Sequence, residues 1–81
     1  MRVTVRFFAR LRELAGTEIM TVEVSAPATV RTVWQHAAAA SPALAPFERA
    51  ISCAVNASFS RMSNPVSEGD DVAFLPPVSG G

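Results

Sequence analysis

The sequence predicts a single α+β domain, in which a mixed sheet of four to five strands carries one main helix on one face. Its 81 residues are enough for one domain with a modest core, and 49% of them are apolar, which argues against disorder. Apolar and polar residues alternate with the period of a half-buried strand near both ends, whereas a segment between them has the period of a helix. The order is strand, strand, helix, strand, short strand, strand, which is typical of an α+β arrangement.

The first two strands are predicted from alternation. In residues 2–8, two valines and Phe7 share one face, whereas charged and hydroxyl side chains share the other. Residues 18–24 alternate in the same way, which predicts a second strand paired with the first as a wide hairpin. Between them, residues 9–16 predict a short helical turn that Gly16 closes in a left-handed conformation.

The main helix is predicted within residues 27–40. Thr29 is a good N-cap, and Ser41-Pro42 ends the helix because the residue before a proline avoids helical dihedrals. Apolar residues recur at the i, i+3, i+4 and i+7 spacing of one helix face, which should pack on the sheet. These residues are Val30, Val33, Trp34 and Ala37.

The second half of the chain predicts three further strands. Residues 42–50 contain two prolines and predict a loop with at most one helical turn, which apolar Leu44 and Phe47 hold against the core. Residues 51–56 predict a third strand, and Asn56-Ala57 a turn into a short strand around Phe59. Residues 64–71 then form a connection, and residues 71–76 the last strand.

This order of elements matches the β-grasp, or ubiquitin-like, plan. In that plan the helix is a right-handed crossover, and the first and last strands lie side by side in the middle of the sheet. Periodicity does not determine strand order, so this arrangement is predicted from the match of the pattern.

Most catalytic sites are excluded by composition. There is one histidine and one cysteine, so no zinc cluster is expected, and we interpret His36 as a surface residue and Cys53 as a buried, inert thiol. No glycine-rich phosphate loop is present. The acidic residues Glu68, Asp70 and Asp71 are interpreted as a solvated turn rather than a metal site. We expect no bound metal or cofactor and no catalysis by this chain alone.

Charge and hydropathy limit the partners. The net charge is zero, which gives no reason to expect nucleic acid or an anionic membrane as a partner. No apolar run approaches the roughly 20 residues of a membrane span, the N-terminus lacks a signal-peptide pattern, and one cysteine allows no internal disulfide. These features predict a cytoplasmic protein. All seven basic residues are arginine, which is interpreted as compositional bias or as protection of a reactive acyl group from lysine.

The C-terminal segment FLPPVSGG is predicted to be a functional tail. Phe74 anchors the last strand, and Pro76 and Pro77 end the hydrogen-bond ladder and hold the backbone extended. Residues 76–81 can then reach about 20 Å from the sheet. Because the two glycines lack side chains, a partner's narrow channel can close on the backbone of Gly80 and Gly81. The reactive group is the α-carboxylate of Gly81, which becomes an electrophile when a separate enzyme adenylates it with ATP.

A docking patch is predicted from residues that break the alternation. Phe8 leaves the core face of the first strand and Leu75 leaves that of the last strand, so in neighbouring strands both project away from the helix. Phe59 is expected to join them. Exposed apolar groups near the tail would form a partner site, unless a loop covers them.

Four segments carry a resemblance to a known family: VRFFARLRELAG at 5–16, ATVRTVWQH at 28–36, AVN at 54–56 and EGDDVAFLPPVSGG at 68–81. Over its whole length the chain resembles the small subunits of molybdopterin synthase, which are sulfur carriers with a ubiquitin-like fold. Two prolines, an apolar residue, a small residue and Gly-Gly form the most specific motif. Sulfur carriers of thiamin synthesis are similar but usually shorter, without the double proline.

The resemblance implies one sulfur-carrier domain, residues 1–81, with residues 76–81 as its functional tail. A ubiquitin-activating-like adenylyltransferase would adenylate the Gly81 carboxylate, and a sulfur donor system would convert it to a thiocarboxylate. Inside the large synthase subunit, the tail residues Pro76, Pro77, Val78, Ser79 and Gly80 would carry the sulfur to a cyclic pyranopterin precursor. Two carriers are consumed per molybdopterin, and a heterotetramer of two small and two large subunits is expected.

The same resemblance assigns partner docking to Phe8, Phe59 and Leu75 by position. Phe59 stands where the family often has a smaller aliphatic residue, and Leu75 where it often has phenylalanine, which bears on partner choice rather than on the tail's chemistry. Three other functions stay open. They are a sulfur carrier for thiamin or another sulfur-containing product, a protein modifier that forms isopeptide bonds, and an interaction module with an accidental Gly-Gly.

Overall fold

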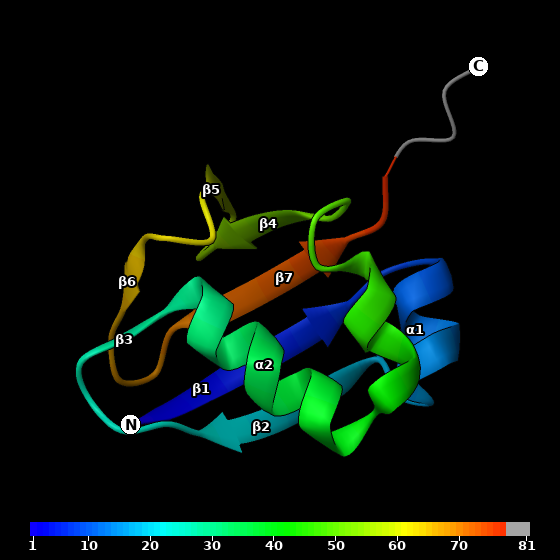
Figure 1. Cartoon of the computed structure of the whole chain (residues 1–81). Helices are drawn as coiled ribbons and strands as arrows, with labels where there is room; N and C mark the ends of the chain where they lie inside the picture. Colours follow the sequence, from blue (N-terminus) through cyan, green and yellow to red (C-terminus); the bar gives the residue numbers. More distant parts are fainter. Residues whose placement is uncertain (78–81) are drawn as a thin grey trace.

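The computed structural model describes residues 1–77, and its elements follow the predicted order (Figure 1). Seven strands, two α-helices and one 3₁₀-helix lie in this part of the chain. In order they are β1 (Arg2–Phe7), α1 (Arg10–Ala15), β2 (Ile19–Glu23), β3 (Ala28–Thr29), α2 (Val30–Ala40), η1 (Pro42–Phe47), β4 (Ser52–Val55), β5 (Ser58–Ser60), β6 (Pro65–Val66) and β7 (Asp71–Leu75).

The main sheet has five strands in the order β2-β1-β7-β4-β5. The first and last strands of the chain, β1 and β7, are parallel neighbours at its centre, and every other pair in this sheet is antiparallel. The α+β class and the ubiquitin-like β-grasp arrangement are therefore confirmed, including the central position of the two terminal strands. Helix α2 lies across one face of this sheet (Figure 1).

Helix α2 begins where the sequence predicts and buries the predicted face. The Thr29 side chain accepts a hydrogen bond from the Thr32 backbone N–H, and the Thr32 hydroxyl accepts one from the Thr29 N–H, so the two residues form a capping box. The four predicted apolar positions of the helix are all buried. Trp34 packs edge-on against Phe74 of β7, with ring centroids 4.9 Å apart, so the helix holds the last strand directly.

Two short segments differ from the sequence-based expectation. Residues 42–47 form a six-residue 3₁₀-helix rather than a loop with at most one turn, because Pro42 suits a helix start and Leu44 is completely buried. The predicted connection at 64–71 contains β6, which pairs with β3. Two-residue strands show no periodicity, so alternation could not reveal this pair.

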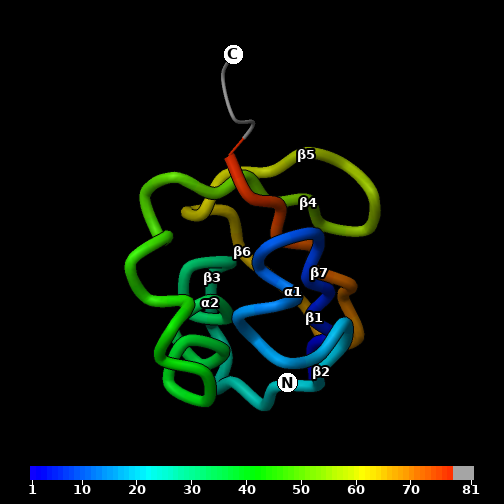
Figure 2. Tube along the Cα trace, turned by 90° about the vertical axis from the view of Figure 1, so that its right-hand side faces the viewer, coloured from blue at the N-terminus to red at the C-terminus, as the bar shows by residue number. Residues whose placement is uncertain are grey.

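Strand β7 ends at Leu75, and no regular element includes Pro76 or Pro77, as expected of residues without a backbone donor. Because β1 and β7 are parallel, β7 ends beside the end of β1 and far from Met1. The two views agree that the segment running to Pro77 and the N-terminus lie at opposite ends of the molecule (Figures 1 and 2).

Candidate functional site

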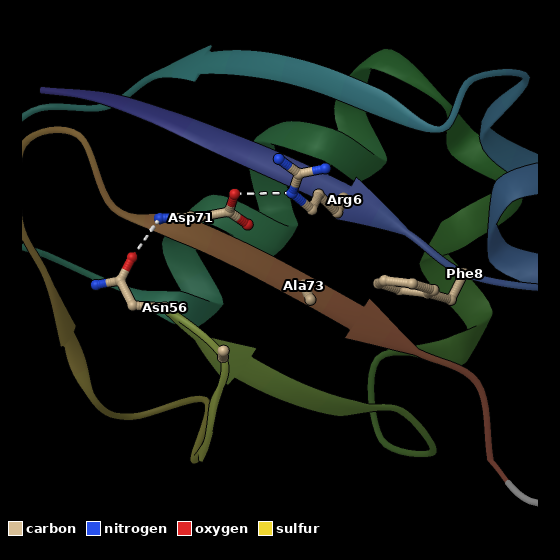
Figure 3. A pocket seen from close by; sticks show the side chains of 6 residues that line it. Arg6, Phe8, Asn56, Asp71 and Ala73 are labelled. Atoms are coloured by element: carbon tan, nitrogen blue, oxygen red, sulfur yellow. Dashed lines mark hydrogen bonds and ion pairs between the residues drawn. The ribbon is translucent and has the colours of Figure 1, made fainter.

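The face of the main sheet opposite α2, here called the outer face, is where the predicted docking residues lie. Within residues 1–77 no helix covers it (Figure 3). Phe8 follows β1 directly, its backbone N–H donates to the Phe74 carbonyl over 3.3 Å, and its side chain is 45% exposed. Leu75 ends the neighbouring strand β7 and is half-buried. The structure therefore brings Phe8 and Leu75 together where β7 ends.

Phe59 lies on the same sheet but not beside Phe8. It is 84% exposed on the edge strand β5, opposite Ala54 of β4, which is in turn opposite Ala73 of β7. Two strand spacings, or roughly 10 Å, therefore separate the Phe59 position from β7. Phe59 is at the border of the outer face, whereas Phe8 and Leu75 are near its centre.

Sequence reasoning missed Ile19 as a surface apolar residue of this face. Ile19 is 46% exposed and lies opposite Arg6, on the other edge strand β2. Alternation along residues 18–24 places Ile19 on the face away from the core, so the signal was present in the sequence. With Ile19 and Phe59 at its two edges, the outer face has apolar groups across its whole width.

An open pocket of about 300 Å³ lies on the outer face next to Phe8 (Figure 3). The Phe8 ring lies over the sheet toward Ala73, and the Arg6 side chain points toward Asp71. Arg6 Nε donates to Asp71 Oδ2 over 2.7 Å, which joins β1 to β7. The lining residues are Arg6, Phe8, Asn56, Ala57, Asp71 and Ala73.

Asn56 fixes the polar end of this pocket. Its side-chain Oδ1 accepts from the Asp71 backbone N–H over 3.0 Å, and its Nδ2 donates to Asp70 Oδ1 over 3.1 Å. Its own backbone N–H donates to the Asp71 carbonyl over 2.7 Å. The β4–β5 turn is thus held against the start of β7. The pocket is lined by residues of β1 and its end, of β7 and of the β4–β5 turn. Periodicity does not give the register of these segments, so sequence reasoning could not find the pocket.

The other candidate groups lie apart from this face or inside the core. Cys53 is buried, its thiol lies 3.3 Å from the Ser60 carbonyl that accepts its hydrogen bond, and burial raises the pKa of the Cys53 thiol. An unreactive thiol is thereby expected. His36 is exposed on α2. In the part of the chain that is described, no three histidine, cysteine or acidic side chains gather as a metal site, and no helix is long and apolar enough to cross a membrane.

The predicted tail is described only in part. Pro76 is half-buried and Pro77 is exposed, and both follow β7 directly. The predicted tail residues Val78, Ser79, Gly80 and Gly81 lie outside the described residues.

A five-stranded sheet with parallel terminal strands at its centre and a helix packed on one face defines a ubiquitin-like β-grasp protein. Residues 5–81 match the family model described as the ThiS family. This chain belongs to the ThiS family.

Known proteins support the same resemblance. The chain is 43% identical to the molybdopterin synthase sulfur carrier subunit of Escherichia coli (strain K12), over 98% of this chain and 99% of that protein. It is 30% identical to SAMP1 from Haloferax volcanii, a small archaeal modifier protein, with a TM-score of 0.87 and complete coverage of both chains. A complex of subunits 1 and 2 of the molybdopterin-converting factor from Helicobacter pylori 26695 contains a chain that is 25% identical, with a TM-score of 0.66 and complete coverage of both chains. The predicted resemblance to molybdopterin synthase small subunits is confirmed.

Proposed function

We propose that this chain is the sulfur carrier subunit of a molybdopterin synthase, with residues 1–81 as one domain and residues 76–81 as its functional tail. One observation carries the proposal: β7, a central strand of the sheet, ends beside the exposed side chain of Phe8. Pro76 and Pro77 therefore follow Leu75 next to exposed and half-buried apolar side chains, which suit a protein partner. The relative from Escherichia coli, which covers almost the whole chain, carries the same function in its name.

The chemistry requires Gly81 to be the last residue of the mature chain. In a ubiquitin-activating-like adenylyltransferase, the Gly81 carboxylate attacks the α-phosphate of ATP, forming an acyl-adenylate and releasing pyrophosphate. A donor system then supplies sulfur at the oxidation level of sulfide, which attacks the acyl carbon, displaces AMP and leaves a thiocarboxylate. In the large subunit this sulfur passes to a cyclic pyranopterin precursor, and two carriers supply the two sulfurs of molybdopterin. The carrier supplies sulfur but no catalytic group.

The docking residues of this proposal are Phe8, Leu75 and Phe59, and the partner is the molybdopterin synthase large subunit. The helix-free outer face can lie flat on a partner while the tail enters the partner's active site. The complex of two subunits from Helicobacter pylori is consistent with such a pair. We propose an assembly of two small and two large subunits.

The intact mass of the chain isolated from its own organism tests the chemistry. We expect a fraction whose mass has risen by the replacement of one carboxylate oxygen by sulfur, and tandem spectrometry should place the change on Gly81. A matched strain without the adenylyltransferase should give only the unmodified mass. The proposal fails if the mature chain continues past Gly81, or if no sulfur is found while the large subunit is active.

A pull-down with the chain tagged at its N-terminus, which leaves Gly81 free, tests the pathway. Recovery of a molybdopterin synthase large subunit is expected. Recovery of a thiazole synthase or another sulfur-accepting enzyme in its place would keep the thiocarboxylate and reject the pterin substrate.

A protein modifier is the second candidate, because the chain also resembles the small archaeal modifier protein of Haloferax volcanii. The tail would then form isopeptide bonds with other proteins. Blotting a cell extract for the tagged chain separates the two functions, since a modifier gives adducts of higher mass that survive reducing agents. A sulfur carrier gives only the free chain.

A further inference from the structure

The pocket on the outer face has a shape that follows from the order of its side chains. One row of residues crosses the sheet in register, and its members point to the same face. In order from edge to edge they are Ile19, Arg6, Ala73, Ala54 and Phe59. Two alanines therefore stand between larger side chains, so the middle of the row is low.

The two sides of the pocket differ in chemistry (Figure 3). The Phe8 ring bounds the side nearest the end of β7, and Ala73 forms an apolar floor. The Arg6–Asp71 ion pair bounds the opposite side, and its two side chains are only about half accessible to water. An apolar side chain that enters the pocket would contact the Phe8 ring, the Ala73 methyl group and the aliphatic stem of Arg6.

Beyond the ion pair the surface carries more acid than base. The acidic residues are Glu23, Glu68, Asp70 and Asp71, and the basic residues among them are Arg2 and Arg6. Arg2 pairs with Glu23, its backbone N–H donates to Glu68, and Arg6 pairs with Asp71. Two basic side chains lie among four acidic ones, and the Met1 ammonium, which donates to the Val24 carbonyl at the same end, adds one positive charge, so one negative charge is in excess. Such a surface attracts a cationic partner group.

We propose that this pocket is the anchor site for one apolar side chain of the large subunit, with a lysine or arginine of that subunit placed beside Asp70. This inference rests on the proposed function and adds the chemistry of the contact. The pocket adjoins Phe8 and thus the site where the tail leaves, so one partner surface reaches both. The apolar anchor gives affinity, and the cation, directed at the acidic end, fixes the orientation in which the tail enters its channel.

The anchor is tested by filling the pocket. Ala73→Leu places a larger side chain on the floor, and Gln35→Leu is the matched control, because Gln35 is exposed on α2, on the opposite side of the sheet from the pocket. The Kd of the full chain for the large subunit of the same organism is measured by titration calorimetry. We expect the Kd to rise at least about tenfold for Ala73→Leu and to change less than about threefold for Gln35→Leu.

The proposed lysine or arginine of the large subunit is tested with two single variants of this chain, each of which removes one negative charge. Asp70→Asn removes one charge of the acidic end, whereas Glu48→Gln removes the charge of a carboxylate paired with Arg31 of α2, on the helix side. Because the two Asp70 carboxylate oxygens accept from Asn56 Nδ2 and the Ser67 backbone N–H, the free energy of unfolding of Asp70→Asn is measured alongside its binding. We expect the association rate constant at low salt to fall about threefold or more for Asp70→Asn only, with a weaker salt dependence.

The outcomes of these experiments distinguish this inference from the proposed function on which it rests. Equal Kd values for the unsubstituted chain and a folded Ala73→Leu variant would overturn the anchor, and equal association rates for the two charge variants would overturn the cation. If Ala73→Leu does not fold, Ala73→Val, which raises the same pocket floor by less and leaves the Arg6–Asp71 ion pair in place, is measured instead, with a smaller rise in Kd expected. Failure of the unsubstituted chain to bind any large subunit would contradict the proposed function and this inference together.

Discussion

Three residues other than glycine have positive φ angles within residues 1–77: Ala9, Asn56 and Ala57. The last two are consecutive in the β4–β5 turn, with φ of 50° and 70°, as two-residue hairpin turns with the twist of the flanking strands require. Asparagine tolerates this region, whereas the Cβ of alanine is strained there. The turn is thus stabilised by the Asn56 hydrogen bonds and strained at Ala57.

Ala57→Gly should therefore raise the free energy of unfolding by about 1 kcal/mol, because glycine adopts positive φ without strain. Urea unfolding followed by the fluorescence of Trp34 measures this change. Ala39→Gly is the matched control, since Ala39 is exposed in α2, and it should lower the same free energy by about 1 kcal/mol. A loss of stability in Ala57→Gly would show that the turn is not strained.

Cys53 should limit stability in alkali, because burial raises the pKa of its thiol. Below the ordinary thiol pKa of about 8.5, the thiol is neutral in both states and contributes no pH dependence. Above it the unfolded chain loses this proton first, so the free energy of unfolding falls as pH rises. The chain has no tyrosine or lysine to titrate in this range.

Urea midpoints at about pH 7.5 and about pH 10 measure that fall. Cys53→Ala should show a smaller fall, because its packing loss does not depend on pH. An equal fall in the free energy of unfolding of the unsubstituted chain and of Cys53→Ala would show that the Cys53 thiol does not cause it.

Among the elements, β7 has two different faces. Phe74 points inward, is fully buried and contacts both Trp34 and Phe7, with ring centroids 4.9 and 6.3 Å away. Leu75, the next residue, belongs to the outer face and is only half-buried. Neighbouring residues of one strand thus serve stability and the candidate docking surface separately.

Substitutions on the two faces should therefore separate folding from binding. Phe74→Ala should lower the free energy of unfolding by about 3–5 kcal/mol, because it leaves a cavity between the helix and the sheet. Leu75→Arg should lower it by less than about 1 kcal/mol and should weaken binding to the large subunit. Chemical unfolding and a binding titration on the same samples test both. Unfolding of Leu75→Arg by more than roughly 3 kcal/mol would assign Leu75 to the core.

The elements that the sequence predicts well are those with several periods of a pattern. The Thr29 cap and the spacing from Val30 to Ala37 identified α2, and alternation identified β1 and β2, because burial on one face imposes these periods. The β3–β6 pair is only two residues long, and the formation of η1 depends on the burial of Leu44. Neither element therefore produces a periodic pattern in the local sequence. The strand order came from resemblance to known folds, since pairing is a property of distant segments.

At the scale of the whole molecule, the candidate site could be predicted only where it depends on single strands. Phe8 and Leu75 break the alternation of their own strands, so their exposure was readable from the sequence. The pocket depends on the register of β1 with β7 and on the turn beyond β4, which bring Arg6, Asp71 and Asn56 together. No local pattern encodes such a meeting of three segments.

Among residues 1–77, every residue of the buried core lies at or before Phe74, so we expect the last residues to serve function rather than stability. Deletion of Gly81 should leave the thermal midpoint unchanged and abolish sulfur transfer, because the reactive carboxylate moves one residue back. Calorimetry and an assay of molybdopterin formation with the large subunit test this. A marked loss of thermal stability in the shortened chain would contradict it.

The parallel pairing of β1 and β7 also has a mechanical consequence. Met1 lies at one end of this pair and Leu75 at the other, and β7 is bonded to strands on both sides. A pulling force applied between the N-terminus and the tail acts along the two strands and loads their hydrogen bonds together in shear. A domain that is pulled by its tail therefore resists unfolding, because its β1–β7 hydrogen bonds cannot be broken one at a time.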